Sequence, residues 1–138
     1  LNVWKRHWNL NYEKGFVMDK LDEIFMMQKA FDDELMQRRH LEHITFDEWM
    51  QKETLAMVSE LCEMLMETNF KWWKNPKEVN MDAVREELVD VLHFFVSICL
   101  KAGMTAEDLH HLYLEKNKEN FDRQHGKSKK PGYAVVTE

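Results

Sequence analysis

Glycine and proline are scarce in this chain, which has four Gly and two Pro in 138 residues. These two residues interrupt helices most strongly, so a chain nearly free of both can form long continuous helices. Hydrophobic residues make up 44% of the chain, which is enough to build a core despite 32% charged residues. The sequence therefore predicts an all-α fold, and its length predicts one domain over residues 1–138.

Apolar spacing and capping residues predict four helices. Thr45 with Glu48, and Thr105 with Asp108, have the spacing of residues that begin a helix by capping it. The short connection between the second and third helices predicts an antiparallel pair, and so a four-helix bundle-like core. The polar tail over about 125–138, which contains Gly and Pro, is expected to be mobile without a ligand. The expected helices span about 19–41, 45–68, 80–102 and 105–124.

Several classes of protein are disfavoured by composition. No apolar run approaches the length needed to cross a membrane, and the first residues lack the apolar centre of a signal peptide. We therefore expect a cytoplasmic protein without a membrane partner. The formal net charge of −6 disfavours binding to nucleic acid. Cys62 and Cys99 fall in predicted apolar helices, which favours two reduced core thiols over a disulfide.

Two acidic pairs interrupt the apolar helices, Glu60 with Glu63 and Glu87 with Asp90. Helical residues three apart lie on one face, so each pair presents two carboxylates side by side. Like charges that are partly buried need protons, basic partners or a cation, and carboxylate oxygens suit Mg²⁺, Mn²⁺ or Ca²⁺ better than zinc. Antiparallel packing would bring the four acids together. We therefore predict a metal site, with a solvated acidic face as the alternative.

Other polar and aromatic residues could border such a site. His93 follows Asp90 on the same helical face, and Gln28 shares an apolar face of the first helix. Each residue has an alternative reading as a satisfied core group, for Gln28 a buried amide that fixes helix register. Lys71 and Trp73 follow the second helix, where a cation could meet phosphate and an indole could stack on a base. Alternatively, a tryptophan there could close the end of the bundle.

The fourth predicted helix carries a polar stripe at i, i+4 and i+7, made of Lys116, Asn120 and Arg123. A lysine, an amide and an arginine on one face can hold phosphate, although such a stripe can also be an ordinary solvated surface. Tyr133, in the tail, could fold back as a contact in a lid.

With these motifs assembled, the chain resembles the all-α nucleoside triphosphate pyrophosphatases, whose hallmark is an ExxE on one helix and an ExxD on the next. More narrowly, it is similar to the dimeric dUTPases of that MazG-like superfamily. The similarity extends from residue 21 to residue 133. Its further motifs are MQK at 27–29, FKWW at 70–73, VDVLHFF at 89–95, and KNKENFDRQ at 116–124 with the later GY.

This resemblance implies a role for each candidate residue. The four acids would bind Mg²⁺, with Mn²⁺ as a possible substitute, across the triphosphate. Gln28, Trp73 and His93 would help to form the pocket for uracil and deoxyribose. The resemblance also implies a homodimer. The implied phosphate-binding residues are Lys71, Lys116, Asn120, Arg123 and Tyr133.

The function expected from this reading is Mg²⁺-dependent hydrolysis of dUTP to dUMP and pyrophosphate, a reaction that removes dUTP from the nucleotide pool. Metal-activated water would attack, with Glu60 as its base and Glu63 behind it. Two alternatives use the same acids. One is a MazG-like pyrophosphatase for another nucleoside triphosphate, such as dCTP or a modified nucleotide, and the other is a noncatalytic helical bundle that binds a metal.

Overall fold

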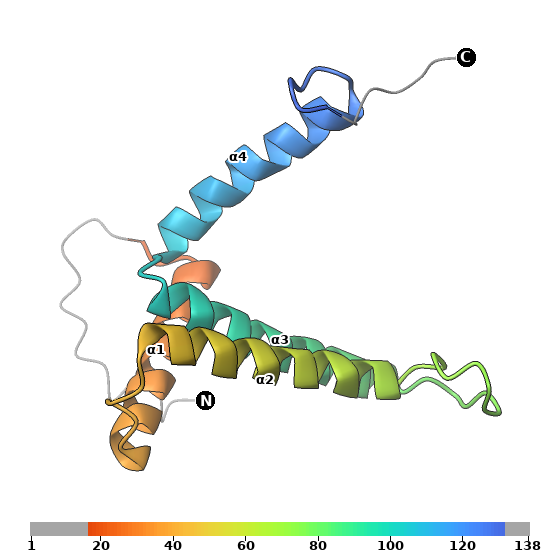
Figure 1. Ribbon diagram of the computed structural model, residues 1–138, viewed down its shortest axis with the longest axis horizontal. Helices are drawn as coiled ribbons and strands as arrows, with labels where there is room; N and C mark the ends of the chain where they lie inside the picture. The colour runs from red at the N-terminus through yellow and green to blue at the C-terminus, as the bar shows by residue number, and fades with distance from the viewer. Residues whose placement is uncertain (1–16, 132–138) are drawn as a thin grey trace.

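The computed structural model describes residues 17–131, which form four α-helices and no strand (Figure 1). This confirms the all-α prediction, and the helix ranges differ from the predicted ones only at their ends. The helices are α1 (Lys20–Arg39), α2 (Phe46–Met66), α3 (Met81–Lys101) and α4 (Ala106–Gln124).

Side-chain caps define where the helices begin. Thr45 and Thr105 form the predicted capping boxes, in which each threonine hydroxyl accepts from the backbone three residues later and the acid there accepts from the threonine backbone. Asp19 caps α1 in the same way, and Asn80 accepts from two backbone N–H groups at the start of α3. These contacts satisfy donors that a helix cannot pair internally, so the local sequence fixes all four starts.

Helices α2 and α3 run antiparallel, side by side, and form the α2–α3 hairpin (Figure 1). The connection over 67–80 is a loop, as the sequence predicts for 69–80, and α2 ends two residues earlier than expected. Asn69 holds this loop closed, because its side chain donates to the Lys77 carbonyl and accepts from the Lys77 N–H, both at 2.8 Å. The loop therefore returns the chain directly from α2 to α3, which sets the two acidic helices against each other.

The core lies where α1, the last turns of α3 and the first turn of α4 meet. Among the described residues it contains four buried apolar side chains, namely Phe25, Val96, Cys99 and Ala106. Helix α4 then projects away from the hairpin (Figure 1). Its axis is bent by 103° from that of α3 after a turn in which Gly103 has a φ of 77°, a left-handed value that glycine adopts without strain. Many large apolar side chains are consequently exposed.

The sequence prediction of two core thiols is wrong for Cys62, and the apolar face of α1 is only partly buried. Ile24 and Phe31, which share that face by helical spacing, are 38% and 59% exposed. Helix α1 crosses one end of the hairpin, so only a short part of its apolar face, around Phe25, reaches the core (Figure 1). Cys62 is exposed on α2, whereas Cys99 is buried as predicted, and both thiols are free.

No helix within residues 17–131 is by itself long and apolar enough to cross a bilayer, and α3 and α4 meet the length and composition criterion only as a bent pair.

Candidate functional site

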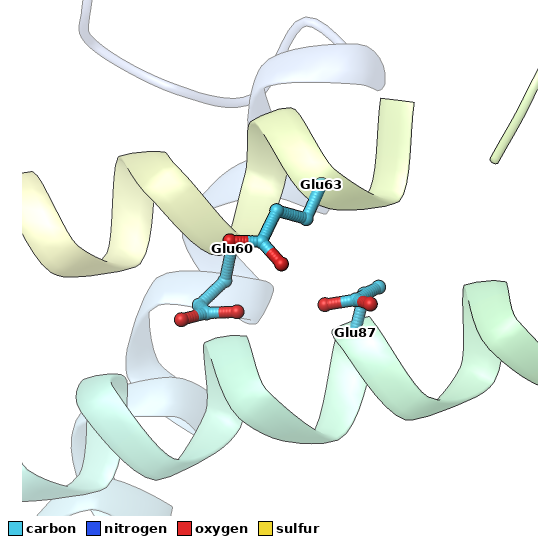
Figure 2. Close-up of side chains that lie close together, drawn as sticks. All are labelled: Glu60, Glu63 and Glu87. Carbon is cyan, nitrogen blue, oxygen red and sulfur yellow. The ribbon is translucent and has the colours of Figure 1, made fainter. Parts of the chain in front are cut away.

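Three carboxylates meet between the two helices of the hairpin. Glu60 and Glu63 come from α2 and Glu87 from α3, and each offers an oxygen within 4.8 Å of the others. Figure 2 shows the three side chains directed toward a common space between the helices. The i, i+3 spacing puts Glu60 and Glu63 on one face of α2, and the hairpin turn brings Glu87 to that face. We call this group the acidic cluster.

The surroundings of Glu60 and Glu87 disfavour the ionised forms of these two carboxyl groups. Partial desolvation, followed by the charges of Glu63 and Asp90, raises the pKa of Glu60 above its ordinary value of 4.5. The pKa of Glu87 is raised by the same kind of desolvation and by the neighbouring carboxylates, with Glu63 the largest contributor among them. Like charges at short range repel because water does not fully screen them. A positive charge placed among these carboxylates would therefore reduce their mutual repulsion.

Asp90 stands one helical turn after Glu87 and is half-buried. It lies outside the close group of three, although its charge acts on both Glu60 and Glu87. The structure therefore brings three of the four predicted acids into close contact and places the fourth beside them.

The donor set of the acidic cluster fits a hard divalent cation. All three groups offer carboxylate oxygens, the ligands that Mg²⁺ and Mn²⁺ prefer. Within residues 17–131, none of the three acids forms an ion pair with a lysine or an arginine. A cation would supply the charge that the protein side chains do not.

Gln28 and His93 are joined directly, although 65 residues separate them in sequence. The side chain of Gln28 is buried on α1, and its Oε1 lies 2.7 Å from Nδ1 of His93 on α3. His93 itself is exposed, so a ligand can reach its ring. His93 is one turn after Asp90 on α3, the helix that also carries Glu87, so this contact joins Gln28 of α1 to the helix of the acidic cluster.

Behind Gln28 lies a network of buried polar side chains, which we call the buried network. Asp32 accepts from Gln28 Nε2 at 2.9 Å, and Ser97 Oγ lies 2.5 Å from Asp32 Oδ2 and 2.7 Å from Glu53 Oε1. Lys101 donates to Ser97 Oγ at 2.7 Å and to Glu53 at 2.8 Å. These groups tie α1, α2 and α3 together at the end of the hairpin nearest α4.

Only part of the buried network is evident in the sequence. Ser97 is four residues after His93 and so shares the helical face on which the sequence places Asp90 and His93, whereas nothing in the sequence distinguishes Asp32, Glu53 and Lys101 from solvated charges. The available signal was spacing, because Asp32 is one turn after Gln28 and Lys101 is one turn after Ser97. The ammonium of Lys101 also lies 4.6 Å from the centre of the Trp49 ring, a cation–π contact that the spacing within one helix could not reveal.

The aromatic loop between α2 and α3 does not close the end of the bundle. Trp72 and Trp73 are 86% and 60% exposed, so the alternative of a tryptophan plug is wrong for this chain taken alone. The two rings meet edge to face at 5.8 Å. Lys71 is half-buried, with Nζ 5.6 Å from the centre of the Phe70 ring. The loop therefore leaves an indole and a cation available beyond the end of the acidic helix α2.

The stripe of α4 is separated from the acidic cluster. Lys116 and Asn120 are exposed, while Arg123 is half-buried and donates to Glu119 at 3.0 Å. Helix α4 carries all three away from the hairpin (Figure 1). A single chain in this conformation does not bring them to the acids. Tyr133 lies outside the described residues.

Comparison with known proteins gives the family. A family model described as dUTPase matches residues 20–105, from α1 to the turn after α3, which include the acidic cluster, Gln28 and His93. Proteins named dCTP pyrophosphatase in Enterobacteria phage T4 and Enterobacteria phage LZ5 are each 46% identical to the chain over 41 residues. That segment is 30% of this chain, and it spans about a quarter of those curated relatives, 24% of the length of each. No solved structure matches significantly. Since the family model covers more than half of the sequence, the chain belongs to this all-α dUTPase family.

Proposed function

We propose that this protein is a nucleoside triphosphate pyrophosphatase that hydrolyses dUTP to dUMP and pyrophosphate with Mg²⁺. The observation that carries the proposal is the acidic cluster, in which three carboxylates from neighbouring helices converge without a basic partner among the described residues. Membership of the dUTPase family supports the same reaction. Mn²⁺ has similar ligand preferences and is the expected substitute.

The proposed metal ligands are Glu60, Glu63, Glu87 and Asp90. When bound, Mg²⁺ neutralises charge on the triphosphate and lowers the pKa of water. Glu60 is the proposed general base, with Glu63 behind it. Glu60 belongs to the acidic cluster, so one of its carboxylate oxygens could accept a proton from water held at the metal site. Lys71, Lys116, Asn120, Arg123 and Tyr133 are the proposed phosphate-binding residues.

The base and sugar would be held by Gln28, Trp73 and His93. Gln28 and His93 already form a connected pair of polar groups, and the exposed ring of Trp73 offers a face on which a base can stack. A second candidate substrate is dCTP, which is favoured by the names of the two phage relatives. The two substrates have the same triphosphate, so the choice between them depends on the base pocket alone.

A homodimer is part of the proposal. The hairpin exposes an apolar stripe on each helix, made of Val58, Leu61 and Leu65 on α2 and of Leu88, Leu92 and Phe95 on α3. Each stripe has helical spacing, so a second copy could cover it with its own. A partner could also supply the α4 stripe that a single chain holds away from its acids. We further propose a cytoplasmic location, where the nucleotide substrate is found.

A panel of nucleoside triphosphates tests the proposal. The purified protein is incubated with Mg²⁺ and dUTP, dCTP, dTTP or dATP, and pyrophosphate and the monophosphate are measured. Release of both from dUTP in preference to the others is expected. Preference for dCTP would replace dUTP with the second candidate, and binding of Mg²⁺ without hydrolysis of any nucleotide would leave only a noncatalytic metal-binding bundle.

A further inference from the structure

The amide of Gln28 has only one orientation compatible with its neighbours. An ionised carboxylate accepts hydrogen bonds and donates none, so the group of Gln28 that faces Asp32 Oδ1 at 2.9 Å must be the NH₂. The carbonyl oxygen of Gln28 then faces His93. The oxygen and the nitrogen of a glutamine amide have nearly the same shape, so they are assigned from their hydrogen-bond partners. Here the acceptor Asp32 identifies the nitrogen.

The orientation of Gln28 determines which nitrogen of His93 carries a proton. Oε1 of Gln28 can only accept, and it lies 2.7 Å from Nδ1 of His93, so Nδ1 must be the donor. In a neutral imidazole with its proton on Nδ1, the other nitrogen, Nε2, is an acceptor. His93 is exposed, and this acceptor is therefore accessible to a ligand.

Asp32 is itself held firmly in place. It is 9% exposed, and its Oδ2 lies 2.5 Å from Ser97 Oγ and 3.4 Å from Lys101 Nζ. Lys101 has donors only, so it requires an acceptor at Oδ2. The carboxylate is thus anchored on one side by α3 and presents its other oxygen to Gln28 on α1.

We propose that Asp32 is a positioning residue for base selection: through Gln28 it holds His93 in the Nδ1-protonated tautomer and leaves Nε2 as an acceptor for a base N–H group. The choice of substrate in this inference rests on the proposed function. The chain of hydrogen bonds from Asp32 through Gln28 to His93 does not depend on it. The ring nitrogen N3 of uracil carries a hydrogen, whereas N3 of cytosine is an acceptor. An acceptor at His93 that meets this position favours uracil.

The first experiment measures the tautomer without any nucleotide. Long-range ¹H–¹⁵N correlation spectra of the whole protein distinguish a protonated from an unprotonated ring nitrogen, and a His93→Gln variant assigns the signal. The wild-type protein is expected to carry the hydrogen on Nδ1. A hydrogen on Nε2 of the neutral ring would overturn the proposal, and this measurement needs no substitution in the buried network.

The variant Asp32→Asn is expected to invert the tautomer. The carbonyl oxygen of the substituted side chain should remain beside Lys101, so its NH₂ takes the place of Oδ1. Gln28 must then turn its carbonyl toward this NH₂ and its own NH₂ toward His93, which makes Nδ1 an acceptor and moves the hydrogen to Nε2. An unchanged tautomer in the folded variant would refute the positioning role.

Ser97→Ala is the matched control. It removes a group that contacts Asp32 and Glu53 but leaves the acceptor for Gln28 in place. The control should lose stability while keeping the wild-type tautomer. If both variants invert the tautomer, general loosening of the buried network explains the result and Asp32 has no specific role.

The second experiment asks whether the tautomer selects the base. The ratio of kcat/KM for dUTP to that for dCTP should fall about tenfold or more in Asp32→Asn, because a donor would replace an acceptor beside the base. It should stay near the wild-type value in Ser97→Ala. Inversion of the tautomer with an unchanged ratio would refute base selection. Failure of the wild-type protein to hydrolyse any nucleotide would refute the proposed function, and the spectra would still decide the role of Asp32 in fixing His93.

Discussion

Glu60 on α2 and Glu87 on α3 bring carboxylate oxygens within 4.8 Å of one another across the hairpin, and no lysine or arginine among the described residues pairs with either. The pKa values of both groups are raised. Two neighbouring helices therefore hold carboxylates that repel one another between them. Repulsion between these carboxylates disfavours the arrangement by itself, and a bound cation would offset it.

Mg²⁺ is expected to stabilise the folded protein. Since a cation that binds only the native state shifts unfolding by mass action, saturating Mg²⁺ should raise the melting temperature by about 5 °C or more. Glu87→Gln should abolish most of this shift, whereas Glu86→Gln, at an exposed neighbour on the same helix, should retain it. Calorimetric scans with and without Mg²⁺ measure the effect, and equal shifts in both variants would remove Glu87 from the metal site.

Without metal, the contribution of Glu87 to stability should fall as the pH rises through the carboxyl range. A carboxyl group whose pKa is raised in the folded state binds protons better there than in the unfolded chain. Its favourable contribution is therefore complete below the ordinary value of 4.5 and is lost as the pH rises through the raised pKa. Metal-free Glu87→Gln should melt at a higher temperature than wild type at pH 7. The difference should vanish below about pH 4, and a difference that persists there would contradict this explanation.

Glu60→Gln should reduce catalysis more than binding. Removal of a general base typically costs a factor of about 10² to 10⁴ in rate, so kcat for the preferred nucleotide should fall by at least about 100-fold. Glu86→Gln is again the control and should keep wild-type kcat. A normal kcat in Glu60→Gln, measured by pyrophosphate release at saturating Mg²⁺, would assign the base to another group.

Lys101 should be far more important for stability than a surface lysine. It lies between the buried carboxylates of Asp32 and Glu53, and Lys101→Met leaves both without their cation, which should cost about 3 kcal/mol in free energy of unfolding. Lys29→Met breaks an exposed pair with Asp33 and should cost less than about 1 kcal/mol. Urea unfolding of the two variants measures both values. Similar costs would show that the buried network contributes no more than a surface ion pair.

The apolar stripe on α3 should be needed for association. Phe95→Asp places a charge on this stripe and should convert a dimer into a monomer, as measured by light scattering after size exclusion. Ser59→Asp adds the same charge at an exposed polar position of α2 and should leave the dimer intact. A wild-type protein that is monomeric at all concentrations tested would refute the proposed homodimer.

A mixture of two inactive variants tests which subunit supplies the α4 stripe to the acidic cluster. If the partner supplies this stripe, mixing inactive Glu60→Gln with inactive Arg123→Ala should restore activity. In a mixed dimer, one site combines the intact acids of the Arg123→Ala chain with the intact α4 stripe of the Glu60→Gln chain. No recovery after denaturation and refolding of the mixture would mean that each chain uses its own α4.

Local sequence was sufficient to predict the helices and the meeting of the acids. Thr45 and Thr105 have side chains that bond to the backbone three residues later, so their effect depends only on neighbours in sequence. The short connection made α2 and α3 neighbours, and the i, i+3 spacing then aligned Glu60 with Glu63. These predictions needed no knowledge of distant contacts.

Long-range packing was not predictable in the same way. The direction of α4 depends on the turn at Gly103, and helical periodicity carries no information about that angle. Gln28 could be read equally well as a buried amide or as a ligand-binding group, because its partner His93 is 65 residues away. The charges of Asp32 and Lys101 look like solvated groups in sequence, and only the crossing of α1 with the hairpin buries them together.

The small number of buried apolar side chains in the core, four among residues 17–131, has a consequence for the protein in the cell. Burial of so few apolar side chains within one chain offsets little of the conformational entropy lost on folding. When association supplies the remaining burial, the folded fraction depends on how much of the protein has been made. Low expression would then lower activity twice, once through the number of molecules and again through the share of them that is folded.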